Sequence, residues 1–135
     1  MSAVVFVDAN IPMYLVGAND RYRTDARRLV ERAIEARERL VTNAEVLQEI
    51  LHRYTAIHQR DAIQPAFDAL LGVVDEVFPV TVDDVERAKS IVQGRRKHSA
   101  RDAIHIATME RNRVTRIMTF DKGFDGYPGV TRITI

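Results

Sequence analysis

The N-terminal segment constrains the fold of this chain more than any other. Residues 3–7 read Ala-Val-Val-Phe-Val, an apolar run without polar alternation. Such a run is typical of a strand buried on both faces of a parallel sheet. The run ends at Asp8, and Pro12 then suits the first turn of a helix. We therefore expect Asp8 at the carboxyl end of an inner strand, facing the crevice where open α/β sheets bind ligands.

The acidic side chain at this strand end needs a partner. Burying an unpaired carboxylate costs several kcal/mol, so Asp8 must meet a cation, a hydrogen-bond donor or water. A simple alternative is that Asp8 only caps the helix that follows. The N-terminal segment by itself leaves both interpretations open.

Composition limits the classes of protein that remain. The chain has 135 residues, of which 46% are hydrophobic and 29% charged, so we expect one soluble globular domain over residues 1–135. The absence of cysteine excludes disulfides, zinc–thiolate sites and a thiol nucleophile. No secretory signal or membrane-length apolar run is present, so we expect a cytoplasmic location. The net charge is +1, so any attraction to nucleic acid must be local.

Apolar periodicity predicts strands alternating with helices. We expect strands at residues 3–7, 40–41, 77–80, 116–120 and 130–135, the last at a sheet edge. Helix caps are predicted at Thr24, Thr42 (with Glu45), Asp61, Thr81 (with Asp84) and Ser99, and residues 19–23 are predicted to form a loop. This order indicates an α/β fold with a mostly parallel five-stranded sheet sandwiched by helices.

Four acidic residues occupy related places in this order. Asp8 and Asp121 each follow a strand directly, Asp102 lies in the first turn of a helix, and Glu49 lies in the helix after the second strand. Parallel strands have their carboxyl ends at one edge of the sheet, so we expect these carboxylates to converge there.

Each of the later acids also has a purely structural explanation. Asp102 stands three residues after Ser99 and could complete a capping box. Glu49 stands four residues before Arg53, a spacing that suits a surface ion pair worth about 0.3–0.5 kcal/mol. Asp121 could simply open a turn.

Taken together, the acids favour a metal site. Clustered carboxylates repel and raise one another's pKa values, which a divalent cation relieves. Oxygen ligands favour Mg²⁺ or Mn²⁺ over zinc, and the four histidines lack zinc-binding spacings. A metal of this kind activates water and stabilises charge on a phosphoryl oxygen, which is the chemistry of phosphodiester hydrolysis.

The motifs around these acids resemble those of the PIN-domain ribonucleases, and within them the VapC-type toxins of type II toxin–antitoxin pairs. The resemblance covers nearly the whole chain in length and order of elements. It rests on four stretches: VFVDAN at 5–10, VLQEILHR at 46–53, SARDAIHIAT at 99–108 and MTFDKGF at 118–124. It implies a single PIN-like domain and an Mg²⁺- or Mn²⁺-dependent endoribonuclease that hydrolyses RNA through metal-activated water.

The resemblance also implies roles for the four acids. Asp8 and Asp102 match the principal metal ligands. Asp121 would complete the metal site, directly or through water. Glu49 would bind or position a second metal or the attacking water.

Other polar residues near these motifs are weighed differently. Asn10 and Thr119 match positions that line the family's site, where they would orient carboxylates or water. His105 shares a helical face with Asp102, and we interpret it as a packed or capping residue. Asp125 is interpreted as a solvated loop residue. Whether His105 and Asp125 take part stays open.

A basic connection precedes Asp102 and is the candidate RNA contact. Its residues are Arg95, Arg96, Lys97 and Arg101. A basic run is commonly just a solvated loop, but its place beside the predicted metal site favours contact with phosphate. Little aromatic interleaving accompanies it, so the sequence does not indicate which bases the RNA would carry at the site.

The resemblance further implies partners, and several other functions stay open. The implied partners are RNA, a cognate VapB-type antitoxin and a second copy of the chain. Other candidates are a PIN-fold nuclease of RNA processing and a non-catalytic RNA- or protein-binding module. A phosphatase of the haloacid dehalogenase type would need an Asp where Asn10 stands. A receiver domain would need paired acids after the first strand and an acceptor Asp after the third.

Overall fold

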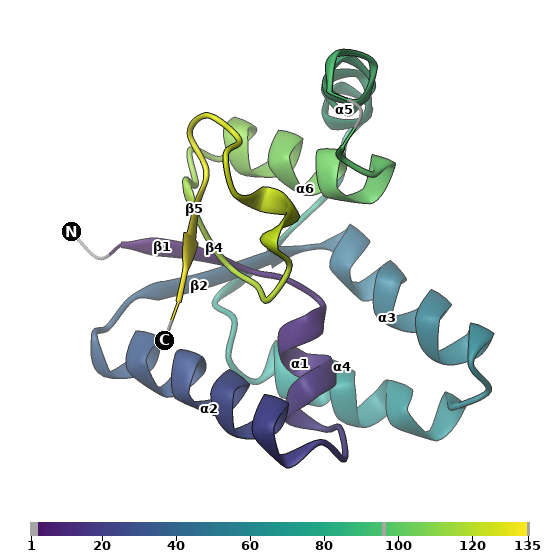
Figure 1. Ribbon diagram of the computed structural model, residues 1–135, viewed down its shortest axis with the longest axis vertical. Helices are drawn as coiled ribbons and strands as arrows, with labels where there is room; N and C mark the ends of the chain where they lie inside the picture. Colours follow the sequence, from purple (N-terminus) through teal and green to yellow (C-terminus); the bar gives the residue numbers. More distant parts are fainter. Residues whose placement is uncertain (1–2, 96, 135) are drawn as a thin grey trace.

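The computed structural model describes residues 3–95 and 97–134. Its centre is a five-stranded sheet in the order β3-β2-β1-β4-β5, in which every neighbouring pair is parallel (Figure 1). The strands are β1 Val4–Val7, β2 Arg39–Asn43, β3 Glu76–Phe78, β4 Arg116–Met118 and β5 Thr131–Ile133. The predicted α/β class is confirmed, and β5 forms one edge of the sheet as expected.

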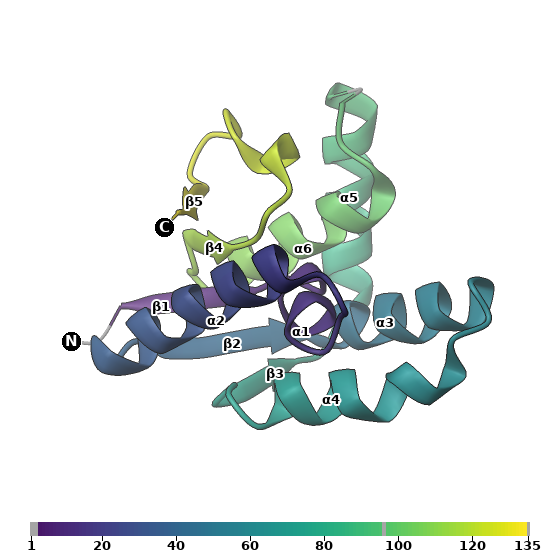
Figure 2. The same ribbon diagram turned by 60° about the horizontal axis from the view of Figure 1, so that its bottom comes forward.

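Helices cover the sheet on both sides. They are α1 Asn10–Leu15, α2 Asp20–Glu35, α3 Ala44–Ala56, α4 Ile63–Leu71, α5 Val82–Gly94 and α6 Ala100–Arg111, with short 3₁₀ turns η1 Arg60–Ala62 and η2 Lys122–Phe124. Helix α1 packs against α2 and α4, while α5 pairs with α6. Figure 2 places α5 and α6 on one side of β1 and β2 and α4 on the other. Helix α3 contacts both α4 and α6 and so borders the carboxyl edge of the sheet.

Strand β1 is the innermost strand, as its unbroken apolar run predicts. It pairs with β2 on one side and β4 on the other, and Val5, Phe6 and Val7 are completely buried. Because both faces are covered by helices, alternation of polar and apolar residues would place polar groups in the core. Because β1 is the middle strand of the sheet and ends at Val7, Asp8 lies at the centre of the sheet's carboxyl edge.

The start of α2 differs from the prediction. Residues 20–23, predicted as a loop, form the first helical turn, and Thr24 lies inside the helix. The cap is Asn19, whose side chain accepts a hydrogen bond from the Tyr22 N–H at 3.0 Å. Arg23 pairs with Asp20 within that turn, which adds to the stability of a polar helix start. The polar residues 20–23 suggested a loop, but they form the capped first turn of α2.

The predicted capping box at Thr42 and Glu45 is wrong. Strand β2 runs to Asn43, which caps α3 by accepting a hydrogen bond from the Val46 N–H at 2.9 Å. Thr42 is buried in the sheet, where its hydroxyl donates to the Val7 carbonyl oxygen at 2.9 Å. Asn caps helices as well as Thr does, and β-branched Thr suits a strand, so both residues fit their observed places.

Of the remaining predicted helix caps, one is wrong and two are confirmed. Asp61 does not cap α4; it lies in η1, and α4 begins without a side-chain cap. The capping box between Thr81 and Asp84 at the start of α5 is confirmed, as is the Ser99 cap of α6. The third, fourth and fifth strands are each shorter than predicted, and the predicted strand end at Ile135 lies outside the described residues.

Candidate active site

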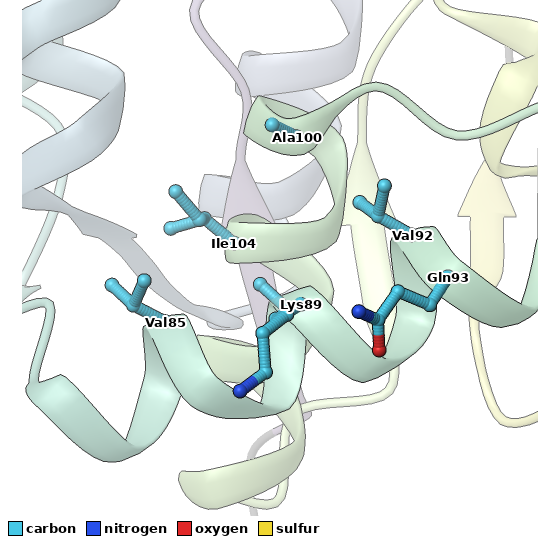
Figure 3. Close-up of a pocket in the computed structure, with 7 residues that line it drawn as sticks. Val85, Lys89, Val92, Gln93, Ala100 and Ile104 are labelled. Carbon is cyan, nitrogen blue, oxygen red and sulfur yellow. The ribbon is translucent and has the colours of Figure 1, made fainter.

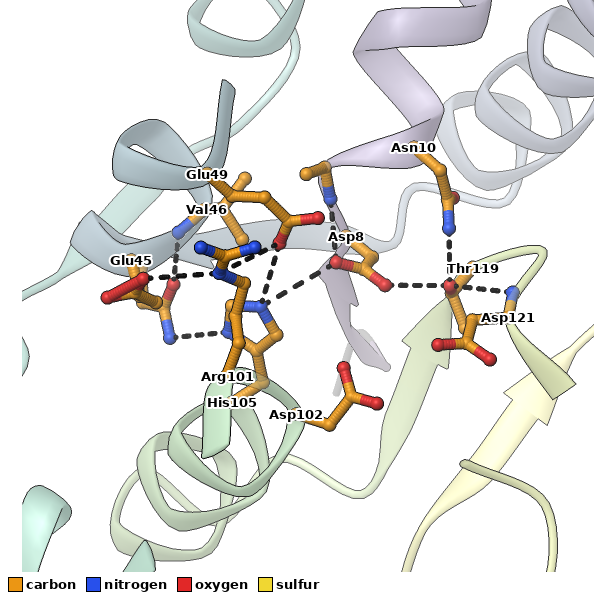
Figure 4. Close-up of polar contacts among 12 residues, drawn as sticks. Asp8, Asn10, Glu45, Val46, Glu49, Arg101, Asp102, His105, Thr119 and Asp121 are labelled. Atoms are coloured by element: carbon orange, nitrogen blue, oxygen red, sulfur yellow. Dashed lines mark hydrogen bonds and ion pairs between the residues drawn. The ribbon is translucent and has the colours of Figure 1, made fainter. Parts of the chain in front are cut away.

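The carboxyl ends of the central strands open into a polar pocket of about 200 Å³. Its lining residues are Asp8, Asn10, Met13, Tyr14, Glu49, Arg53, Asp102 and Asp121. The structure therefore brings the four predicted acids into one pocket, from the segment after β1, α3, α6 and the segment after β4 (Figure 4).

Asp8 lies at the floor of the pocket. Its side chain is almost completely buried, and its Oδ1 accepts a hydrogen bond from the Ala9 N–H at 2.7 Å. Burial raises the pKa of Asp8 above its ordinary value, although His105 and the Thr119 hydroxyl partly oppose the shift. The alternative that Asp8 merely caps a helix fails, because α1 has Ala9 at its N-cap position and no side-chain cap.

Thr119 joins the ends of β1 and β4. Its hydroxyl donates to Asp8 Oδ2 at 2.7 Å and accepts from Asn10 Nδ2 at 2.9 Å and from the Asp121 N–H at 3.1 Å. Asn10 also accepts from the Phe120 N–H at 3.3 Å. With two bonds accepted, the single hydroxyl proton is directed at Asp8. Asn10 and Thr119 thus orient Asp8, in the positions where the motif placed them.

Asp102 belongs to the first turn of α6. Its N–H donates to Ser99 Oγ at 3.1 Å. The reciprocal bond of a capping box forms between Thr81 and Asp84 in α5 but not here, among the residues that the structure describes. Burial, together with the charges of Asp121 and Asp8, raises the pKa of Asp102 to about 6. Asp102 lines the pocket together with the other three acids.

Asp121 has two functions at once. It lines the pocket, and its Oδ1 accepts from the Gly123 N–H at 2.8 Å, which caps η2. The turn explanation from the sequence is therefore correct, and it is compatible with a place in the pocket. Asp121 is the most exposed of the four acids.

Glu49 points from α3 across the pocket. Its Oε1 lies 3.6 Å from His105 Nε2 and 3.9 Å from Arg101 Nε. The ion pair with Arg53 that its spacing suggested is not formed within the described part of the chain. Arg53 instead lines the pocket beside it.

His105 was interpreted as a packed or capping residue; it is packed, and it also lies beside two of the pocket acids, Asp8 and Glu49. Its ring is completely buried against Phe6, with 5.3 Å between ring centroids. Its Nε2 lies 3.7 Å from Asp8 Oδ1, while its Nδ1 lies 3.1 Å from Asn43 Nδ2. Burial disfavours the charged ring, but the carboxylates of Glu49 and Asp8 outweigh this effect and raise the pKa of His105. The i, i+3 spacing from Asp102 was the available sequence signal.

The donor set fits a divalent cation. One oxygen or nitrogen atom from each of Asp8, Glu49 and His105 lies within 4.8 Å of the others. Asp102 and Asp121 add carboxylates to the same pocket. Burial is the main cause of the raised pKa values of Asp8 and Asp102, and neighbouring carboxylates add to both shifts, an effect that a bound cation would oppose. An oxygen-rich, negatively charged pocket suits Mg²⁺ or Mn²⁺.

The described basic residues before and at the start of α6 each contact a neighbouring part of the protein. Arg95 stacks over the Tyr127 ring at 4.9 Å, and Lys97 Nζ donates to the Asp125 carbonyl oxygen at 3.0 Å. Arg101 turns toward the acids, with its Nε 3.5 Å from Glu45 Oε1. Arg96, predicted with them, lies outside the described residues.

Asp125 does not line the pocket. Its carboxylate pairs with Arg132, with 2.9 Å between Oδ1 and Nε. This ion pair lowers the pKa of Asp125, in contrast to the raised pKa values of the pocket acids. The interpretation of Asp125 as a residue apart from the site agrees with this position.

An aromatic cluster borders the acidic pocket and was missed by the sequence analysis. Tyr14, which lines the pocket, stacks on Tyr22 with 4.7 Å between ring centroids and 17° between ring planes. Phe120 meets Tyr14 edge-on at 5.2 Å, and Tyr22 is 43% exposed. The rings come from α1, α2 and the segment after β4, so no local pattern could indicate them.

A second, apolar cleft of about 270 Å³ lies between α5 and α6. Its lining residues are Val85, Ala88, Lys89, Val92, Gln93, Ala100 and Ile104 (Figure 3). Acids are absent from this lining, so the chemistry of the acidic pocket has no counterpart here.

Comparison with known proteins decides the family. The sequence profile of the PIN domain matches residues 5–130. The chain belongs to the PIN domain family. It is 58% identical over 130 residues to Ribonuclease VapC13 of Mycobacterium tuberculosis, a match that covers 96% of this chain and 99% of the relative. The predicted resemblance to PIN-domain proteins of VapC type is therefore confirmed, and the phosphatase and receiver alternatives lose their basis.

Solved structures agree with this assignment. The crystal structure of Mycobacterium tuberculosis VapC20, described as a sarcin–ricin loop cleaving toxin, has a TM-score of 0.74 at 26% identity and covers 93% of this chain and 98% of that one. VapBC-5 of the same species, a member of the VapBC family of toxin–antitoxin systems, has a TM-score of 0.59 at 21% identity and covers 98% and 99% of the two chains. The second likeness shows the fold alone. None of the described helices combines the length and apolarity needed to cross a membrane.

Proposed function

We propose that this protein is an Mg²⁺- or Mn²⁺-dependent endoribonuclease that acts as a VapC-type toxin. The observation that carries the proposal is the convergence of Asp8, Glu49, Asp102 and Asp121 in one pocket. The near full-length similarity to a relative named as a VapC ribonuclease supports the choice of RNA as substrate. In this proposal residues 1–135 act as one nuclease domain in the cytoplasm.

The pocket residues would divide the work of hydrolysis. Asp8, Asp102 and Asp121 would hold the metal, and Glu49 would complete the site or orient the attacking water. The bound metal supplies a Lewis acid that activates water and stabilises charge on the phosphoryl oxygen. Thr119 and Asn10 keep the Asp8 carboxylate in one orientation through the hydrogen bonds described above.

The surroundings of the pocket suit single-stranded RNA. Arg53 lines the pocket, and Arg95 and Lys97 lie on the connection before α6, so phosphate meets local positive charge despite the small net charge. Tyr22 supplies the stacking surface that the sequence analysis did not find. We assign to it a base next to the scissile phosphate, because stacking on an exposed aromatic ring binds any base.

Two protein partners belong to the same proposal. A cognate VapB-type antitoxin would cover the acidic pocket, where a cationic side chain would relieve the repulsion among the carboxylates. A second copy of the chain would bind through the apolar surface of α5, where Val82 is 78% and Val85 49% exposed. Val85 also lines the cleft of Figure 3. Two-fold pairing would place each α5 against its equivalent.

The test in cells is to map RNA 5′ ends after pulsed expression. The wild-type protein should create discrete new 5′ ends, and Asp8→Ala should create none. Asp125→Ala is the matched control, because this acid is paired with Arg132 outside the pocket and its removal should leave the cleavage pattern intact. New ends that persist with Asp8→Ala would contradict the proposal. A non-catalytic binding module would give no new ends with any variant.

A further inference from the structure

The side-chain amide of Asn43 can have only one orientation. Its Oδ1 accepts from the Val46 N–H at 2.9 Å, which caps α3. Its Nδ2 faces Thr108 Oγ1 at 3.2 Å, and that hydroxyl already donates its proton to the Ile104 carbonyl oxygen at 2.8 Å. Exchanging the amide O and N would set donor against donor at Val46 and acceptor against acceptor at Thr108. Two independent contacts therefore fix the amide.

The fixed amide in turn determines where His105 carries its proton. Asn43 Nδ2 is a donor and lies 3.1 Å from His105 Nδ1, so Nδ1 must accept. A neutral imidazole has one acceptor and one donor nitrogen, so Nε2 carries the hydrogen. The helix cap of α3 thereby selects the tautomer of a histidine on α6.

The Nε2–H group is aimed at the carboxylates of the pocket. It lies 3.7 Å from Asp8 Oδ1 and 3.6 Å from Glu49 Oε1, and it is buried without a closer hydrogen-bond partner among the residues that the structure describes (Figure 4). Proximity makes His105 look like a third metal ligand beside these two acids. A metal-binding imidazole, however, donates its other ring N–H to an acceptor. Asn43 offers Nδ1 a donor instead.

We propose that Asn43 fixes His105 as the Nε2–H tautomer, which makes His105 a positioning residue for the Asp8 and Glu49 carboxylates and excludes it from the metal's ligands. The second half of this inference rests on the proposed metal-dependent function. The first half concerns the metal-free protein and can be tested without any activity.

The tautomer can be measured directly by long-range ¹H–¹⁵N NMR of the metal-free protein at mildly alkaline pH. The chain has four histidines, and the signal missing from the His105→Gln spectrum identifies His105. We expect a protonated Nε2 and an unprotonated Nδ1. A protonated Nδ1 in the wild-type protein would overturn the proposal, whatever the outcome for RNA cleavage.

Asn43→Asp is the matched variant for the cause of the tautomer. Aspartate caps helices as well as asparagine does, so α3 keeps its cap. Its second carboxylate oxygen presents an acceptor to His105, so we expect the proton to appear on Nδ1. An unchanged tautomer in a folded Asn43→Asp protein would show that the amide is not the cause and would overturn the proposal. If the variant does not fold, the wild-type spectrum still decides.

Mn²⁺ affinity separates positioning from direct coordination. Loss of a group that orients metal ligands costs about 10–100-fold in metal affinity, which we expect for His105→Leu. His105→Gln places an amide N–H near the position of Nε2–H and should recover most of that loss. Electron spin-echo spectroscopy of the Mn²⁺-loaded wild type should lack a directly bound ¹⁴N. A bound ¹⁴N would overturn the positioning role, whereas no Mn²⁺ binding by the wild type would contradict the proposed function itself.

Discussion

Glu49 is the acid whose role is least determined by its own helix. Its carboxylate faces Arg101 and His105 at 3.9 and 3.6 Å, contacts too long for strong hydrogen bonds. We expect Glu49→Gln to lower RNA cleavage by about 10²-fold or more, because charge in the transition state loses a preorganised partner. Its stability should stay nearly constant or rise, because one repelling carboxylate is removed.

The control for Glu49 is Glu45→Gln. Glu45 lies one turn earlier on α3 and contacts the same Arg101 at 3.5 Å, yet it does not line the pocket. Its substitution should leave the cleavage rate within a few-fold of wild type. Equal, small effects of both substitutions on cleavage at saturating Mn²⁺ would remove Glu49 from the site.

The raised pKa of Asp102 makes the free energy of unfolding depend on pH. Its pKa is raised from 3.8 to about 6, so the native state binds this proton more tightly than the unfolded chain does. The metal-free protein should therefore lose stability as the pH rises from about 4 to about 6. Asp102→Asn should be more stable than wild type above this range, by about 1–2 kcal/mol once solvent screening is considered, and similar below it.

Melting curves in EDTA across this pH range test the prediction for Asp102. Asp68→Asn is the control, because Asp68 is exposed on α4 and its contact from Gln64 survives the change to an amide. Parallel pH profiles for wild type and Asp102→Asn would show that folding does not raise the pKa of Asp102.

At the residue scale, the sequence predicted which acids meet but not what orients them. Asp8 and Asp121 could be placed because they end predicted parallel strands. Asn43 and His105 could not be placed, because their contact joins residues 62 positions apart and depends on the packing of α3 against α6. No local pattern carries that information.

At the scale of elements, the start of α2 is the clearest case in which a wrongly predicted boundary concealed a surface feature. Residues 19–23 look like a loop, but the cap at Asn19 makes them helical and presents Tyr22 beside Tyr14. Tyr22 joins the Tyr14–Phe120 pair in this aromatic surface from the first turn of the helix. Where a capping pattern matched the structure, as at Thr81 and Ser99, the element was also placed correctly.

The proposed stacking of Tyr22 on an RNA base gives a prediction for this element. In an inactive Asp8→Asn background, Tyr22→Leu should weaken binding of single-stranded RNA by about 1–3 kcal/mol, and Tyr22→Phe should bind like its parent. Fluorescence of RNA carrying 2-aminopurine measures both affinity and stacking. Equal affinity and equal quenching in the two variants would assign Tyr22 to packing between α1 and α2 instead.

At the scale of the whole molecule, the parallel sheet explains why the fold was predictable. The apolar run of β1 requires cover on both faces, and the order of strands and helices then leaves few topologies. The caps at Asn19 and Asn43, in place of the predicted Thr24 and Thr42, moved the starts of α2 and α3 but did not change this topology. The partners were not predictable from packing, because the exposed valines of α5 do not specify what covers them.

Metal binding should stabilise the whole molecule if the pocket acids hold a cation. Mn²⁺ at a hundredfold excess over its Kd should add about 2.7 kcal/mol to the free energy of unfolding. The same addition should stabilise Asp102→Asn less, since that variant lacks one ligand. A melting temperature that is identical in EDTA and in Mn²⁺ would count against a carboxylate metal site.

Metal-dependent RNA cleavage by the purified protein tests the central claim most directly. The measurement titrates Mn²⁺ into EDTA-treated wild type and Asp8→Asn and follows cleavage of single-stranded RNA. We predict no cleavage in EDTA, a saturable increase for the wild type, and a loss of about 10²-fold or more for Asp8→Asn with RNA affinity retained. Cleavage that persists in EDTA, or that Asp8→Asn performs as fast as wild type, would contradict the account.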